Sequence, residues 1–181
     1  TFALVGESGC GKSMTALAIM RLLPDNGRVM RGRVALSNKV PDAKPNELLA
    51  LPESSMRRVR GGRVGIIFQE PATSLNPVMR VGDQIVEAIE AHTGLRGLQA
   101  RSKAIHWLKR VGIPEPERRI DSYPFEMSGG QKQRVMIAMT LAAEPDFLIA
   151  DEPTTALDVT IQNQLLDLLK DQQSERQLGM L

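Results

Sequence analysis

The chain has 181 residues, of which 42% are hydrophobic and 24% charged, so it can bury one substantial core and is not expected to be disordered. Its 23 lysine and arginine residues exceed its 21 acidic residues by only two, and a net charge of +2 is too small to indicate a nucleic-acid surface. The single cysteine excludes an internal disulfide, and no apolar run is long enough for a membrane helix.

Both ends of the chain interrupt apolar stretches. The chain opens without a methionine, inside an apolar run, and it stops where another apolar run begins at Gly179. We therefore expect it to be a fragment of a longer protein.

The first elements in chain order predict the opening unit of an α/β fold. Phe2 to Val5 is a short apolar run typical of a buried strand, and a glycine-rich turn leads from it into a helix expected over Met14 to Leu23. Residues 28–36 alternate as in a strand, and the polar stretch from Ser37 to Glu53 is expected to be a surface excursion. Val64 to Phe68 has the continuous apolar pattern of a strand buried on both faces.

The middle of the chain is predicted to be helical. Val81 to His92 and Leu98 to Val111 have helical spacing, whereas Pro114 to Pro124 is expected to be a broken, charged connection. Another helix is expected to begin at Ser128 and to run to about Ala143.

The last elements return to the opening pattern. Phe147 to Ala150 is predicted to be a buried strand, and Val159 to Arg176 a helix. Strands that alternate with helices predict a parallel sheet covered on both faces, which is the α/β class.

One glycine-rich octet, GESGCGKS, matches the phosphate-binding pattern G-x-x-x-x-G-K-[ST] between a predicted strand and a predicted helix. Its glycines would let backbone N–H groups curl around phosphate oxygens, and the helix dipole would add positive potential. Lys12 is expected to reach the outer phosphates of a nucleotide, and Ser13 to ligate Mg²⁺. An ordinary glycine turn into a helix is the structural alternative. The residues expected to contact nucleotide here are Gly6, Glu7, Ser8, Gly9, Cys10, Gly11, Lys12 and Ser13.

Two carboxylates follow the predicted strand that ends at Ala150. Open α/β sheets bind ligands at this end of their strands, so Asp151 is expected to hold Mg²⁺ and Glu152 to orient and polarise an attacking water. A solvated strand end would explain the same pair.

The sequence Ser128-Gly129-Gly130-Gln131 opens a predicted helix. Helix capping alone would explain the serine. It would not explain two glycines in the first turn, which are costly unless a group must approach the backbone closely. A phosphate supplied by another subunit would be such a group.

Five motifs in this order resemble those of the ABC-transporter ATPases, and the resemblance covers nearly the whole chain. They are the octet at residues 6–13, Gln69 after a strand, MSGGQ at 127–131, IADEP at 149–153 and ALD at 156–158.

The resemblance implies a P-loop NTPase (RecA-like) core with a parallel sheet and an inserted α-helical subdomain. The core would comprise residues 1–69 and 128–181, and the helical insertion residues 70–127.

It also implies a role for each matching residue. Glu152 and Gln69 would be catalytic, with Gln69 sensing the region of the Mg²⁺ and the γ-phosphate. Asp158 would lie across a dimer interface. The residues that would grip the γ-phosphate held by a partner subunit are Ser128, Gly129, Gly130 and Gln131, and the metal ligands would be Ser13, Gln69 and Asp151.

Within the family, residues 68–77 (FQEPATSLNP) and 149–161 (IADEPTTALDVTI) resemble the branch that imports dipeptides, oligopeptides, nickel or glutathione. The resemblance implies ATP and Mg²⁺ as cofactors, and as partners a second ABC ATPase subunit, transmembrane permease subunits and, indirectly, a solute-binding protein. It implies no nucleic acid and a peripheral location at the cytoplasmic face of the inner membrane.

Two other functions stay open at this level. A non-transport ABC ATPase acting on nucleic acid would need a basic stripe or a long coiled-coil insertion, and the sequence has neither. A nucleotide-binding module without turnover is the second, because the adenine-stacking aromatic and the switch histidine of the family lie outside these residues. His92 and His106 fall in the helical insertion and are expected to be ordinary packing or surface residues.

Overall fold

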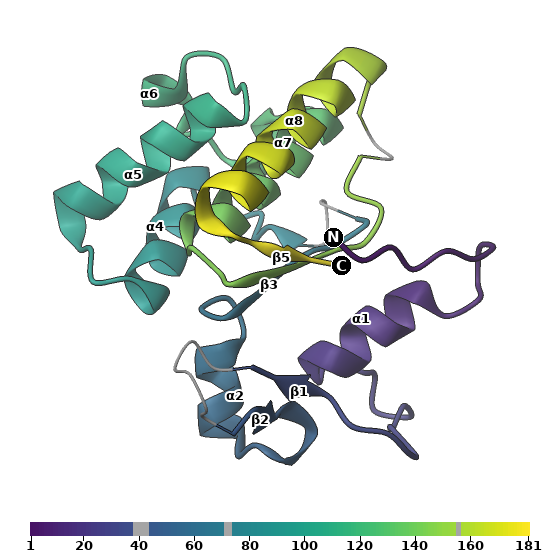
Figure 1. Ribbon diagram of the computed structural model, residues 1–181. Coiled ribbons are helices and arrows are strands. Elements are labelled where there is room, and N and C mark those ends of the chain that lie inside the picture. The colour runs from purple at the N-terminus through teal and green to yellow at the C-terminus, as the bar shows by residue number, and fades with distance from the viewer. Residues whose placement is uncertain (38–43, 71–73, 155–156) are drawn as a thin grey trace.

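The computed structural model describes residues 1–37, 44–70, 74–154 and 157–181, and its centre is a parallel sheet of three strands, β3 (Val64–Ile67), β4 (Phe147–Ala150) and β5 (Gly179–Met180). The strand order is β3-β4-β5, with Val64 opposite Phe147 and Phe147 opposite Gly179 (Figure 1). The central strand β4 lies between strands that are far from it in sequence, as crossover connections through helices require.

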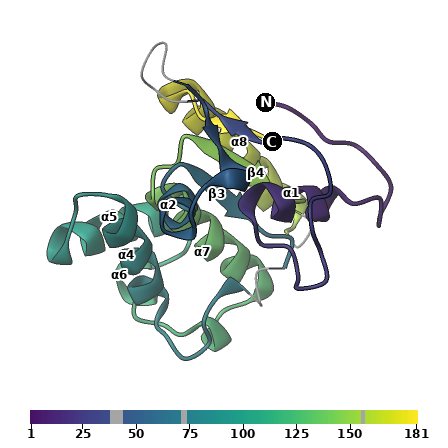
Figure 2. The same cartoon turned by 90° about the horizontal axis from the view of Figure 1, so that it is seen from below.

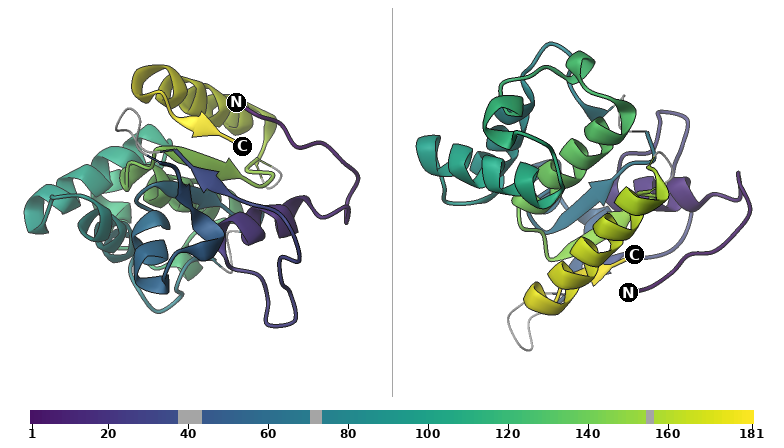
Figure 3. Two further views of the ribbon diagram at one scale, coloured as in Figure 1. Left: turned by 60° about the horizontal axis from the view of Figure 1, so that its bottom comes forward. Right: turned by 90° about the horizontal axis from the view of Figure 1, so that it is seen from above.

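Helices cover both faces of this sheet. Helices α7 (Gly129–Ala142) and α8 (Val159–Arg176) lie on one face, and α1 (Lys12–Met20) and α2 (Glu53–Val59) on the other (Figures 1 and 3). Consecutive residues of β4 divide between the two sides. Leu148 packs in the cluster that contains α7 and α8, and Ile149 packs in the cluster that contains α1 and α2. The predicted double-sided burial of the sheet is therefore confirmed.

A group of helices extends one of these clusters away from the sheet. It contains α4 (Val81–His92), α5 (Gly97–Arg110) and the short α6 (Pro116–Arg119), followed by the 3₁₀ turn η2 (Pro124–Glu126). Both α4 and α5 contact α7, and one continuous hydrophobic cluster joins them to the sheet. Figure 2 shows α4, α5 and α6 to one side of the sheet and α1 on the other side. Among the described helices, none has the length and apolar character needed to cross a bilayer.

Gly82 marks a close contact between α4 and the segment after α6. A Cβ atom at this position would lie 2.6 Å from the carbonyl oxygen of Ile120 and would also clash with its side chain. We expect Gly82→Ala to lower the free energy of unfolding by about 1–3 kcal/mol, the usual cost of overpacking, in urea titrations. Gly94→Ala is the control, because a Cβ there meets nothing within 4 Å. Equal stability of the two variants would contradict this close packing.

A small antiparallel pair lies beside α2. It joins β1 (Ala35–Leu36) to β2 (Asn46–Glu47), which leads into the 3₁₀ turn η1 (Leu48–Ala50). The strand predicted over residues 28–36 is thus limited to its last two residues. The predicted surface excursion is wrong in part, because Leu48 is buried. The position of such a short ladder depends on which residues of the two strands pair, and the composition of either strand alone does not determine this.

The strand predicted over Phe2 to Val5 does not form. Phe2 donates one backbone hydrogen bond to Met180 at 2.7 Å, but Phe2 and Val5 are 75% and 89% exposed. The two termini lie side by side (Figure 1). An apolar run predicts a buried strand only when other elements cover it, and among the described residues no element does so here.

The other bounds follow the sequence closely. The predictions for Val81–His92, Phe147–Ala150 and Val159–Arg176 are confirmed. Helix α1 begins two residues earlier than predicted and ends at Met20, because Arg21 adopts a left-handed conformation with φ of 54°. The broken connection after Pro114 contains the single turn α6, which begins with a proline at its first position.

Candidate functional site

The glycine-rich octet forms an exposed loop that ends at the N-terminus of α1. Gly9 and Gly11 have φ values of 83° and 99°, in the left-handed region that residues with a Cβ rarely adopt. A Cβ at either position would meet nothing within 4 Å, so the backbone conformation, not crowding, requires glycine there. Gly6 differs, because a Cβ there would clash with the sulfur of Cys10. The loop's shape thus depends on its glycines.

Lys12 closes this loop from its helical end. Its Nζ donates hydrogen bonds to the carbonyl oxygens of Gly6 at 2.8 Å and Glu7 at 3.0 Å. Ser13 is the next residue of α1 and is exposed. The ammonium group therefore lies over the loop and beside the helix N-terminus, where both the charge and the dipole favour an anion.

The two predicted carboxylates directly follow β4. The Asp151 N–H donates to the carbonyl oxygen of Ile67 at 3.0 Å, which extends the ladder by one bond. Glu152 then adopts a left-handed conformation with φ of 49°. Its carboxylate accepts a hydrogen bond of 2.9 Å from Nε2 of Gln69, the residue expected to sense the metal region. The turn at Glu152 therefore directs its side chain toward the end of β3.

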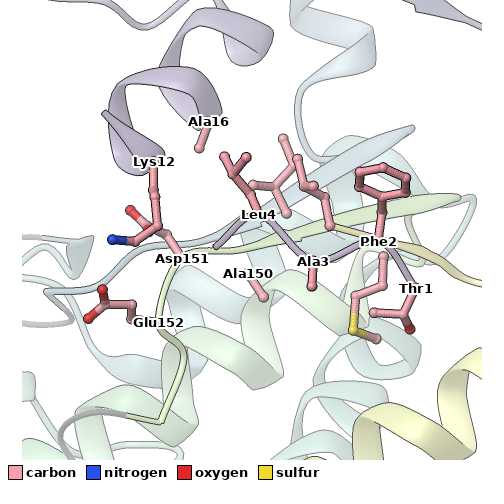
Figure 4. Close-up of a pocket in the computed structure, with 12 residues that line it drawn as sticks. Thr1, Phe2, Ala3, Leu4, Lys12, Ala16, Ala150, Asp151 and Glu152 are labelled. Atoms are coloured by element: carbon pink, nitrogen blue, oxygen red, sulfur yellow. The ribbon is translucent and has the colours of Figure 1, made fainter. Parts of the chain in front are cut away.

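Two cavities gather these side chains. Lys12, Asp151 and Glu152 lie together at one end of a cavity of about 280 Å³, and Thr1 and Phe2 lie at its other end (Figure 4). The residues predicted to hold the metal are Ser13, Gln69 and Asp151, and all three line a second cavity of about 350 Å³. Asp151 lines both cavities.

The Ser128-Gly129-Gly130-Gln131 motif lies at the N-terminus of α7 and lines neither cavity. Ser128 accepts a hydrogen bond from the Gln131 N–H at 3.3 Å, and Gln131 Oε1 accepts one from the Ser128 N–H at 3.0 Å. This capping box accounts for both side chains. It does not account for Gly129, where an added Cβ would meet nothing within 4 Å. An unobstructed backbone there is open to an incoming group.

Asp158 is also a helix cap. Its Oδ1 accepts a hydrogen bond of 3.0 Å from the Ile161 N–H at the start of α8. Two parts of the predicted motifs lie outside the described residues. They are Thr155 and Ala156 of the IADEPTTALDVTI stretch and Pro71 to Thr73 of the FQEPATSLNP stretch.

Neither histidine lines these cavities. His92 packs against the turn at Gly61 and Gly62, and burial lowers its pKa. His106 meets Trp107 edge to face, with ring centroids 6.3 Å apart.

One residue near the acidic turn escaped the sequence prediction. Gln133 is fully buried on α7, and its Nε2 donates a hydrogen bond of 2.9 Å to the carbonyl oxygen of Pro153. A glutamine inside a helix ordinarily indicates a solvent-facing position. No periodic signal in the sequence distinguishes Gln133 from Gln131 or from other polar residues of α7.

The chain matches the ABC transporter family over residues 1–155. A protein of Brucella abortus (strain 2308) named as a peptide import ATP-binding protein is 53% identical to it over 182 residues, which cover all of this chain and 53% of the relative. The oligopeptide transport ATP-binding protein OppD of Bacillus subtilis is 51% identical over 176 residues, 97% of this chain and 47% of the relative. The chain therefore spans about half the length of these relatives.

Solved structures agree with the sequence match. A dimeric structure of MJ0796, described as a bacterial ABC transporter cassette, has a TM-score of 0.80 and 27% identity over 96% of this chain and 70% of the other. A dimeric post-hydrolysis state of MJ0796 bound to ADP and Pi has a TM-score of 0.77 with the same identity and coverage. The order of the motifs, the doubly covered parallel sheet and these matches agree, and the chain belongs to the ABC transporter family.

Proposed function

We propose that this chain binds MgATP and is the ATP-hydrolysing part of an ABC transporter that imports peptides. The observation that carries the proposal is the convergence of Lys12, Asp151 and Glu152 on one cavity and of Ser13, Gln69 and Asp151 on the next. The names of the relatives support the transported class, and the ADP and Pi bound by MJ0796 support the reaction.

The donor set suits Mg²⁺ held together with a nucleotide. Mg²⁺ prefers oxygen ligands and is usually bound by one or two carboxylates plus substrate phosphates and water. Ser13, Gln69 and Asp151 offer a hydroxyl, an amide oxygen and a carboxylate around one cavity. The described residues contain no cluster of three or more histidine, cysteine or acidic residues that could hold a metal alone. In the proposed site, nucleotide phosphate oxygens and water would complete the coordination of Mg²⁺.

The chain's own residues have separate tasks in the proposed reaction, in which ATP and water give ADP and phosphate. The backbone N–H groups of residues 6–13 bind the phosphates, and Lys12 neutralises the outer ones. Glu152 orients and polarises the attacking water, and its hydrogen bond to Gln69 sets the carboxylate's position. MgATP supplies the electrophilic phosphorus and the metal that offsets charge on its oxygens.

We infer that two chains act together, each completing the other's site. Ser128 to Gln131 line neither cavity of their own chain, which is consistent with contact to a phosphate held by another subunit. The dimers of MJ0796 support this arrangement. Asp158 would lie at the interface of this head-to-tail pair.

We further infer that the chain comprises a core of residues 1–69 and 128–181 and a helical insertion of residues 70–127. The insertion would pass ATP-driven closure through Gln69 to transmembrane permease subunits. A solute-binding protein would deliver the peptide, and the chain would bind at the cytoplasmic face of the inner membrane.

A steady-state ATPase assay on this chain and on a version extended at both ends tests whether the protein hydrolyses ATP. Absence of hydrolysis in both would favour the alternative function, a nucleotide-binding module that does not turn over ATP.

Cys10 provides a test of nucleotide position. It is the only cysteine in the chain and is exposed in the glycine-rich loop. We expect bound ATP to slow labelling of Cys10 by a maleimide, because the nucleotide would cover the loop, and complete labelling to block ATP binding. The rate is measured by mass spectrometry, with Cys10→Ser as the unlabelled control. Labelling that is indifferent to ATP would place the nucleotide elsewhere.

A further inference from the structure

Gln133 is a buried amide, and the packing of the core does not explain why a glutamine occupies this position. Its side chain is fully buried on α7, a helix that also buries the apolar residues Val135 and Met136. Its Oε1 has no hydrogen-bond partner among the described residues. An unpartnered buried oxygen destabilises the folded state, so a methionine would suit an ordinary core position better.

The other end of this amide makes one specific contact. Nε2 of Gln133 donates to the carbonyl oxygen of Pro153 at 2.9 Å. The assignment of nitrogen and oxygen is fixed by chemistry, because a carbonyl oxygen can only accept. Proline has no backbone N–H, so this carbonyl is the only backbone group through which Pro153 can be held by a hydrogen bond.

Pro153 directly follows the residue whose position matters most for the proposed reaction. Glu152 has a φ of 49°, which costs energy for a residue with a Cβ and persists only when surrounding contacts hold it. Two amides flank this residue. Gln69 bonds its carboxylate at 2.9 Å, and Gln133 bonds the next carbonyl at 2.9 Å.

We propose that Gln133 is a positioning residue for ATP hydrolysis: it anchors the Glu152-Pro153 turn to α7 and so aims the Glu152 carboxylate. This role rests on the proposed function, in which Glu152 polarises the attacking water. Gln133 touches neither cavity and acts only through the turn. Its loss should therefore impair the chemical step and leave ATP binding intact.

The test is a double-variant cycle on ATP hydrolysis by the full-length protein. Gln133→Met keeps length and volume but removes the donor. Alone it should lower kcat by about 10- to 100-fold, the scale of a misplaced catalytic group, with KM for ATP unchanged. Added to Glu152→Gln, it should change the residual rate by less than about 2-fold, because the carboxylate that it positions is already gone.

Two further variants separate positioning from packing. Gln172→Met removes another buried amide, on α8, whose Nε2 bonds Glu175, and should leave kcat unchanged. Gln133→Glu has the shape of glutamine but can donate to Pro153 only when protonated. Burial raises the pKa of such a carboxyl. The kcat of Gln133→Glu, divided by that of the unmodified protein, should therefore rise as the pH falls, whereas the same ratio for Gln133→Met should not change with pH.

The outcomes are distinct. An unchanged kcat in Gln133→Met, or an equal loss with and without Glu152→Gln, overturns the positioning role. If Gln133→Met does not fold, the pH dependence of kcat in Gln133→Glu tests the positioning role. A kcat ratio to the unmodified protein that does not change with pH would then overturn the role. Absence of hydrolysis in the unmodified full-length protein overturns the proposed function itself, whereas hydrolysis that depends on Glu152 but not on Gln133 overturns only this inference.

Discussion

Lys12→Ala is expected to weaken MgATP binding by at least about 100-fold, because each charge-assisted hydrogen bond to phosphate contributes roughly 1.5–3 kcal/mol. Lys12 is the only cationic residue in the octet at residues 6–13. Its Nζ already lies within hydrogen-bond distance of two loop carbonyls, so it needs only to exchange these partners for phosphate oxygens. Isothermal titration calorimetry with MgATP measures the effect.

Lys170→Ala is the matched control for this variant. Lys170 is exposed on α8 and pairs with Asp167 at 3.3 Å, so removing it deletes a lysine without touching the loop. Because Lys12 also braces Gly6 and Glu7, the thermal midpoint of each variant is measured alongside. Unchanged ATP affinity in Lys12→Ala would contradict the assignment of residues 6–13 as the phosphate-binding loop.

Much of the fold could be predicted wherever a local pattern is strong. The bounds predicted for Val81–His92 and Val159–Arg176 agree with those of the two helices in the structure. The side chain of Asp158 caps the second helix, which the sequence analysis did not predict. The strand at Phe147–Ala150 is short, but its residues are apolar and turn residues flank it. The local pattern was thus sufficient to predict the bounds of these three elements.

Prediction failed where pairing partners decide the structure. Phe2 to Val5 has the composition of a buried strand, yet a strand also needs a neighbour along its length, and Phe2 shares only one backbone bond with Met180. The ladder of Ala35–Leu36 with Asn46–Glu47 likewise depends on a partner strand, which here follows residues 37–45. Composition indicates which segments can form a strand, whereas strand pairing depends on residues elsewhere in the chain.

The candidate site also has a part that the sequence predicts and a part that depends on tertiary structure. The motifs predicted a set of site residues, and three of them, Ser13, Gln69 and Asp151, line one cavity. The left-handed turn at Glu152 and the buried contact from Gln133 could not be predicted, because each depends on a specific backbone geometry that the motif letters do not encode. Contacts to a turn are visible only once the elements around it are placed.

Glu152→Gln should lower the rate of ATP hydrolysis by roughly 10²–10⁴-fold, the usual scale for loss of a general base. The substitution keeps size and hydrogen bonding, including an oxygen that can accept from Gln69, but it removes the basic charge. ATP binding should survive, because Lys12, Ser13 and Asp151 remain. Steady-state hydrolysis and calorimetry on the full-length protein measure the two effects, and hydrolysis at the normal rate would show that Glu152 is not the base.

With ATP bound and not consumed, Glu152→Gln should also accumulate as an ATP-dependent dimer in sedimentation. Adding Ser128→Arg places a bulky side chain at the N-terminus of α7, the position proposed for the partner's γ-phosphate. This addition should return the variant to monomer with ATP still bound. Ser128→Ala is the control, because it loses the same cap, worth about 0.5–2 kcal/mol, without adding bulk. The alanine variant should still dimerise. A Ser128→Arg variant that dimerises with ATP would contradict the composite site, since Ser128 would then face no phosphate.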